Sequence, residues 1–126
     1  MEVGPRNALL MHLTLVPYIP TAGEIKTKPT QHSVKMLREI GIQPDILLCR
    51  IDRELPKALR EKIALFCNVG VDSVIAAPDV DNIYRLPMVF SAQDLDDRIL
   101  SKLGIWAGGA RLQPWHELMD RIDNAR

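Results

Sequence analysis

A basic segment at residues 26–31 has the residue types that bind phosphate. It reads Lys-Thr-Lys-Pro-Thr-Gln and leads into a run with helical spacing of its apolar residues. Free N–H groups in the first turn of a helix, together with the helix dipole, favour an anion, and lysines and threonine hydroxyls strengthen that attraction. We therefore predict a triphosphate site here. The alternative is that the two lysines only solvate an exposed loop.

Charged residues also follow two of the predicted strands. Asp79 and Asp81 come after a short apolar run, where they could hold Mg²⁺ or a ribose hydroxyl, or form a turn with solvated carboxylates. Arg50 ends another apolar run, where it could meet a phosphate or form a structural salt bridge. Both interpretations stay open for each residue.

Several other chemistries lack the residues that they require. The sequence contains neither Gly-x-x-x-x-Gly-Lys-Ser/Thr nor Gly-x-Gly-x-x-Gly, so both standard phosphate-binding loops are missing from it. His12, His32 and His116 lack metal-ligand spacing with the cysteines, so we assign no metal site. Cys49 and Cys67 lie in apolar runs without a neighbouring base, which favours buried free thiols over a nucleophile.

The composition is that of a folded domain without an extended charged face. The 126 residues are 47% hydrophobic, and 16 basic side chains balance 16 acidic ones. This balance argues against a nucleic-acid partner. The longest apolar candidate, residues 8–19, is interrupted by polar residues and proline, so no membrane span is expected. With no secretory signal and no disulfide pattern, a cytoplasmic location is expected.

Three short apolar runs must position these residues. We predict strands at residues 9–16, 45–50 and 74–76, with the first covered on both faces. Helical segments between them predict an α/β fold with a parallel sheet and right-handed crossovers. Ligands in such sheets bind beyond the carboxyl ends of the strands.

The helices are predicted from apolar spacing and from their end signals. One helix is expected at residues 31–40, with Thr30 as its N-cap. A second has Pro56 in its first turn and core-facing residues Leu59, Ile63 and Phe66, with Lys62 beside the core edge.

Two further helices are predicted towards the end of the chain. Asp94 is expected to cap the first, which ends at Gly104. The last begins at Pro114 and has four apolar residues on one side: Trp115, Leu118, Met119 and Ile122.

Several longer strings resemble the CTP synthase family. They are His-Leu-Thr-Leu-Val-Pro-Tyr from His12, Gly-Glu-Ile-Lys-Thr-Lys-Pro-Thr-Gln-His-Ser-Val from Gly23, Gly-Ile-Gln-Pro-Asp-Ile-Leu-Leu-Cys-Arg from Gly41, Lys-Ile-Ala-Leu-Phe-Cys-Asn-Val from Lys62, and Asp-Val-Asp-Asn-Ile-Tyr from Asp79. They occur in the same order and span nearly the whole chain. Pro78, just before the last string, departs from the expected pattern and removes one backbone donor.

The resemblance implies an ATP-driven ligase that aminates UTP to CTP with ammonia from glutamine. It places UTP, and CTP as feedback inhibitor, on a site where subunits of a homotetramer meet. That UTP/CTP site comprises Lys26, Thr27, Lys28, Pro29, Thr30, Gln31 and Lys62. The ATP side comprises Arg50, Asp79, Val80 and Asp81.

The resemblance also implies a partial, three-layer P-loop-like domain. Residues 1–104 would form the second half of the synthetase domain, and residues 105–126 a helix leading to an interdomain linker. The family's phosphate-binding loop, its Mg²⁺ carboxylates and its glutaminase domain, which handles glutamine and GTP, would lie outside this chain. The isolated chain is therefore expected to be inactive. A noncatalytic nucleotide-binding or assembly module is the alternative.

Overall fold

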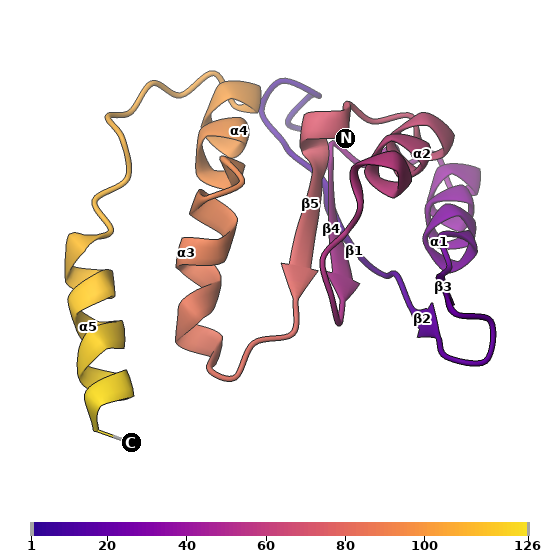
Figure 1. Ribbon diagram of the computed structural model, residues 1–126. Coiled ribbons are helices and arrows are strands. Elements are labelled where there is room, and N and C mark those ends of the chain that lie inside the picture. The colour runs from indigo at the N-terminus through magenta and orange to yellow at the C-terminus, as the bar shows by residue number, and fades with distance from the viewer. Residues whose placement is uncertain (1, 126) are drawn as a thin grey trace. The chain divides into compact units, whose positions relative to one another are not determined.

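The computed structural model describes residues 2–125, which divide into two compact units. The first unit ends at Asp79 and contains strands and helices, and the second begins at Val80 and is helical (Figure 1). No helix among the described residues combines the length and the apolar character needed to cross a membrane.

Three parallel strands form the sheet of the first unit. They are β1 (Met11–Leu15), β4 (Ile46–Ile51) and β5 (Val74–Pro78), in the order β1-β4-β5. Helix α1 (Lys28–Glu39) lies between β1 and β4 in the sequence, and α2 (Lys57–Cys67) and the short 3-10 helix η1 (Val71–Ser73) lie between β4 and β5. The predicted α/β class with a parallel sheet is confirmed.

A small hairpin, which was not predicted from the sequence, precedes α1. Strands β2 (Tyr18–Ile19) and β3 (Glu24–Ile25) pair antiparallel, Tyr18 with Ile25 and Ile19 with Glu24. Gly23 adopts a φ of 64° in the turn, a conformation that glycine adopts at little cost. The hairpin delivers the chain directly to the start of α1.

The core of the first unit lies between α1, α2 and one face of the sheet. Its buried residues come from all three elements and their flanks: Val16, Val34, Leu47, Cys49, Ile51, Leu55, Ile63, Ala64, Cys67 and Val74. Both cysteines are free and buried, as predicted. Burial raises the pKa of both thiols, and that of Cys67 to about 11.

The raised thiol pKa values predict a loss of stability at alkaline pH. Unfolded thiols ionise from about pH 9, whereas the Cys67 thiol keeps its proton to about pH 11 in the folded state. In this window the folded state binds more protons, so the free energy of unfolding falls as pH rises, by at most about 1.4 kcal/mol per pH unit for each thiol. Urea unfolding of Cys67→Ala between pH 8 and pH 11 should show a shallower decline. An unchanged slope would contradict this assignment.

The prediction that β1 is covered on both faces is wrong. Met11, Leu13 and Leu15 are 38%, 59% and 58% exposed, whereas Thr14, on the opposite face, is buried. β1 is an edge strand, and α1 and α2 pack on the face that carries Thr14. The apolar run identified a strand but carried no information on what covers it.

Three predicted details of α1 and α2 also differ in the structure. The N-cap of α1 is Thr27 rather than Thr30, because Pro29 lies in the first helical positions and begins the helix earlier. Pro56 is the N-cap of α2 rather than a residue of its first turn. Phe66 is 57% exposed, and Cys67, four residues after Ile63, occupies the core position instead.

The second unit contains the 3-10 helix η2 (Ile83–Arg85) and three helices, α3 (Leu86–Ser91), α4 (Leu95–Lys102) and α5 (Gln113–Asn124). The predicted last helix is confirmed, and Met119 on its apolar side is buried. Asp94 occupies the N-cap position of α4, but its φ is 59° and its side chain makes no capping hydrogen bond. Helix α3 was not predicted from the sequence.

Candidate functional site

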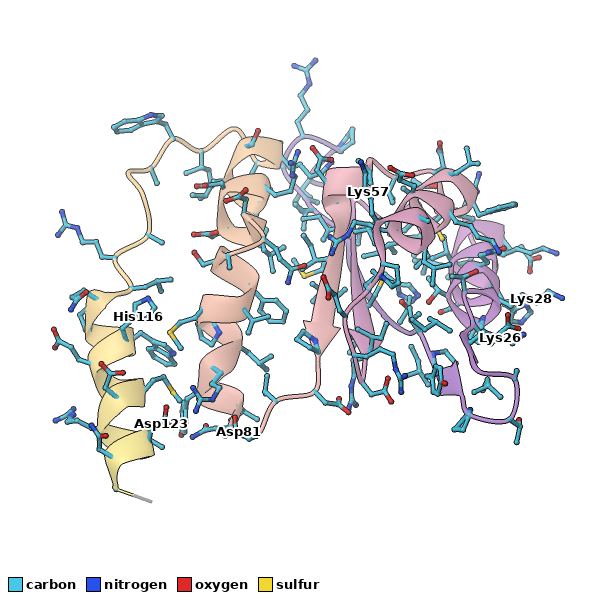
Figure 2. The ribbon with its side chains drawn as sticks, in the orientation of Figure 1. Lys26, Lys28, Lys57, Asp81, His116 and Asp123 are labelled. Atoms are coloured by element: carbon cyan, nitrogen blue, oxygen red, sulfur yellow. The ribbon has the colours of Figure 1, made fainter. Side chains whose placement is uncertain are left out.

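The hairpin, the start of α1 and the middle of α2 bring three lysines to one pocket of about 260 Å³. The pocket is lined by Glu24, Ile25, Lys26, Thr27, Lys28 and Lys62. Lys26 and Lys28 extend near each other beside the first turn of α1 (Figure 2). Lys62 comes from a different helix, so the chain fold, not the local sequence, adds the third positive charge. We call this the lysine pocket.

The charges in the lysine pocket are only partly neutralised. Lys26 forms an ion pair with Glu24. The hydrogen bond from the Lys26 ammonium and the charge of that group hold the pKa of Glu24 below its ordinary value. The more distant charge of Lys62 lowers this pKa further. Within residues 2–125, neither Lys28 nor Lys62 forms an ion pair. One carboxylate thus faces three ammonium groups, which leaves a net positive site for an anion.

The first turn of α1 is ordered by contacts between Thr27 and Gln31. The Gln31 backbone N–H donates to the Thr27 carbonyl oxygen at 3.0 Å, and its side-chain amide donates to Thr27 Oγ1, also at 3.0 Å. Thr27 is 5% exposed, and the first turn contains no acidic residue. The positive end of the α1 dipole therefore lies beside the lysine pocket without a competing carboxylate in that turn.

Thr30 has a different role from the one that its place in the basic segment suggested. Its side chain is fully buried, and its hydroxyl oxygen lies 3.0 Å from Thr14 Oγ1 and 3.1 Å from the Leu15 carbonyl oxygen. This hydroxyl joins α1 to β1 inside the core. The Thr30 side chain is therefore not available to a ligand.

Thr30→Val should therefore destabilise the fold. The nearly isosteric side chain removes the hydroxyl that bonds Thr14 Oγ1 and the Leu15 carbonyl oxygen. That carbonyl loses this partner and Thr14 Oγ1 keeps its contact with Cys49 Sγ at 3.7 Å, at an expected cost of about 1–3 kcal/mol. Chemical denaturation measures this cost, with Thr21→Val at an exposed turn position as the matched control. Equal midpoints for the two variants would contradict the structural role of Thr30.

A larger groove of about 710 Å³ runs along α1 and shares Lys28 with the lysine pocket. Its lining residues are Lys28, Pro29, Gln31, His32, Lys35, Arg38 and Phe66. The two hollows together include the side chains or main chain of six of the seven predicted UTP residues, all except Thr30. The UTP site predicted from the sequence did not include four of these residues: Lys35, Arg38, His32 and Phe66. The helical spacing of the basic residues along α1 was the signal for the first two.

The predicted ATP-side residues are placed in two different units. Arg50 donates to Asp79 Oδ1 at 3.3 Å, and both line a pocket of about 210 Å³ at the carboxyl ends of the strands. Val80 begins the second unit, where Asp81 accepts a 2.7 Å hydrogen bond from Arg85 Nε. Arg85 also donates to Asp123 Oδ1 at 2.6 Å. The structural salt bridge that was one interpretation of Arg50 is therefore present.

The described residues offer no ready metal centre. In residues 2–125, no group of three or more histidine, cysteine, aspartate or glutamate side chains could hold a metal ion. The lysine pocket offers ammonium groups and a helix N-terminus, which can bind a polyphosphate by electrostatic attraction.

Comparison with known proteins identifies relatives over almost the whole chain. The family model described as "CTP synthase N-terminus" matches residues 1–105. The CTP synthase of Geobacter metallireducens is 54% identical over 121 residues, which are 96% of this chain and 22% of that protein. Those of Pelobacter propionicus and Nitrobacter hamburgensis are 55% and 57% identical over 119 and 118 residues, each 94% of this chain and 22% of the relative. The chain spans about a fifth of the length of these relatives, and it belongs to the CTP synthase N-terminus family.

Proposed function

We propose that this chain holds the triphosphate of UTP within a CTP synthase. In the reaction, ATP transfers its γ-phosphoryl group to O4 of the uracil ring. Ammonia released from glutamine then forms the new C4–N bond as the C4–O bond breaks, which gives CTP, ADP and phosphate. The observation that carries the proposal is the convergence of Lys26, Lys28 and Lys62 on one pocket at the start of α1.

In this proposal each residue of the basic segment contributes in its own way. The three ammonium groups bind phosphate oxygens, and a triphosphate competes with Glu24 for Lys26. Thr27 and Gln31 keep the first turn in place, Pro29 begins the helix, and the buried hydroxyl of Thr30 anchors the helix to β1. CTP has the same triphosphate as UTP, so the same contacts explain how the product could inhibit by competing for this site.

The ATP side is proposed at the carboxyl ends of the strands, where Arg50 and Asp79 lie, with contributions from Val80 and Asp81. Bound Mg²⁺ would neutralise the ATP phosphates, and its carboxylate ligands are proposed to lie outside residues 1–126. Arg50 would have to exchange its pairing with Asp79 for a phosphate oxygen, which is a stronger acceptor by charge.

The proposal extends to the arrangement of the whole enzyme. Residues 1–104 would be the second half of the synthetase domain, and residues 105–126 would lead to the linker before a glutaminase domain that handles glutamine and GTP. The enzyme would be a cytoplasmic homotetramer with the UTP site where subunits meet. The relatives are named for the enzyme, which supports this role over a noncatalytic module.

A chimera tests the proposed function. The matching 121-residue segment of the Geobacter metallireducens CTP synthase is exchanged for this sequence, and CTP formation from UTP, ATP and glutamine is measured. We expect the chimera to form CTP with saturable dependence on UTP. A chimera that assembles like its parent but forms no CTP would overturn the proposal.

The isolated 126-residue chain is expected to form no CTP from UTP, ATP and ammonia. Its sequence lacks a standard phosphate-binding loop, so it has no element to hold and activate the ATP triphosphate. The measurement is product formation by the purified chain, with the chimera as the positive control. Turnover by the chain alone would place ATP activation within these residues.

A further inference from the structure

An arginine in the link between β4 and α2 stacks on the hairpin that leads to the lysine pocket. The Arg53 guanidinium carbon lies 3.4 Å from the centroid of the Tyr18 ring, a close cation–π contact. The same guanidinium donates to the two carboxylate oxygens of Asp52, at 2.8 and 3.1 Å. The carboxylate fixes the plane of the guanidinium, and the stacked ring is thereby fixed in turn.

The position of Tyr18 is coupled to that of the basic segment. Tyr18 pairs with Ile25 across the hairpin, and the Lys26 backbone N–H donates to the Pro17 carbonyl oxygen at 2.8 Å. Strands of two residues are too short to be stable alone, so the hairpin depends on contacts with its surroundings. Ile25 supplies one such contact by packing against the core, and Arg53 supplies another through Tyr18.

Arg53 also connects this hairpin to the end of the sheet proposed to face ATP. Asp52, its carboxylate partner, follows β4 directly and lines the same pocket as Arg50, Asp79 and Tyr18. Arg53 itself is not among the residues lining the lysine pocket. A structural effect of Arg53 on that pocket would therefore pass through the ring of Tyr18 and the hairpin.

We propose that Arg53 is a positioning residue for the triphosphate of UTP. By clamping Tyr18, Arg53 holds the hairpin so that Lys26, and Lys28 just beyond it, face the lysine pocket. This inference rests on the function proposed above and adds to it a determinant of UTP affinity outside the pocket.

The test uses the chimeric enzyme and separates KM from kcat. Arg53→Ala should raise the KM for UTP about three- to tenfold, as expected for loss of one exposed cation–π contact and its ordering effect, with little change in kcat or in the KM for ATP. Tyr18→Leu should have the same effect. Arg53→Lys and Tyr18→Phe each keep a cation over a ring and should recover most of the affinity. Arg111→Ala removes an exposed arginine from the second unit and is the matched control.

The double variant Tyr18→Leu/Arg53→Ala decides whether the two residues act together. If the stacking is the cause, the double variant resembles either single variant, because the contact can be lost only once. Additive effects, or an Arg53→Ala enzyme whose KM for UTP equals that of the parent, would overturn this inference. If Arg53→Ala has no effect but Lys28→Ala raises the KM for UTP, the proposed function stands without this inference. If Lys28→Ala has no effect either, the lysine pocket is not the UTP site.

Discussion

Lys28→Ala in the chimeric enzyme is expected to weaken UTP binding by roughly tenfold to a hundredfold. A charged hydrogen bond contributes on the order of 1.5–3 kcal/mol, and Lys28 lines both the lysine pocket and the larger groove along α1. Within residues 2–125 its ammonium forms no ion pair, so its charge is available to a ligand. Calorimetry at matched ionic strength measures the loss, and the affinity for ATP should change much less.

Two comparison variants sharpen the Lys28 result. Lys28→Arg should restore binding only in part, because a planar guanidinium does not replace a compact ammonium beside Pro29 at the helix start. Lys57→Ala is the control, because it removes a positive charge elsewhere on the surface. The Lys57 side chain is 89% exposed and lies apart from Lys26 and Lys28 (Figure 2). Equal UTP affinity for Lys28→Ala and the parent would support the solvated-loop interpretation.

The two strands with mostly buried side chains, β4 and β5, could be predicted from the sequence, because burial imposes a recognisable composition. The apolar runs at Ile46–Ile51 and Val74–Pro78 are bounded by charged residues and proline, and the structure places strands there within one or two residues. β1 and β5 both lie at an edge of the sheet, yet Leu13 and Leu15 of β1 are exposed, whereas Val74 and Ile75 of β5 are buried. The apolar run of β1 therefore predicted a strand but not what covers its faces.

The start of α1 shows a similar limit at the level of single residues. Thr27 and Thr30 are equally suited to an N-cap by residue type. Thr27 takes that position because Pro29, between them, fits the first helical positions. The hairpin before α1 was missed because strands of two residues are too short for a periodic pattern.

The position of the basic segment at a helix start could be predicted locally, but the pocket is a tertiary feature. The sequence placed Lys26 and Lys28 near a helix start, and the structure agrees. Lys62 joined them in the sequence analysis only through the family resemblance, since no spacing rule connects the middle of α2 with the hairpin. Phe66 and Arg38, which both line the larger groove, were not among the residues that the resemblance placed in the UTP site.

Charge reversal at Lys62 is expected to reduce UTP affinity more than any single alanine substitution in the lysine pocket. Lys62→Glu removes one ammonium and adds a carboxylate to a pocket that already contains Glu24, so both changes repel a triphosphate. We expect a loss beyond about a hundredfold, larger than the loss for Lys62→Ala. Because the pocket is open to solvent, rising salt should narrow the difference between the variant and the parent.

Lys57→Glu is the matched control for this reversal, because it makes the same change of charge on the same helix outside the lysine pocket. A general effect of net charge on nucleotide binding would weaken UTP binding equally in both variants. If Lys62 contacts UTP directly, only Lys62→Glu weakens UTP binding. The melting temperatures of both variants should stay near that of the parent, since both side chains are exposed. Equal UTP affinities for the two variants would remove α2 from the site and leave the basic segment alone as the proposed triphosphate contact.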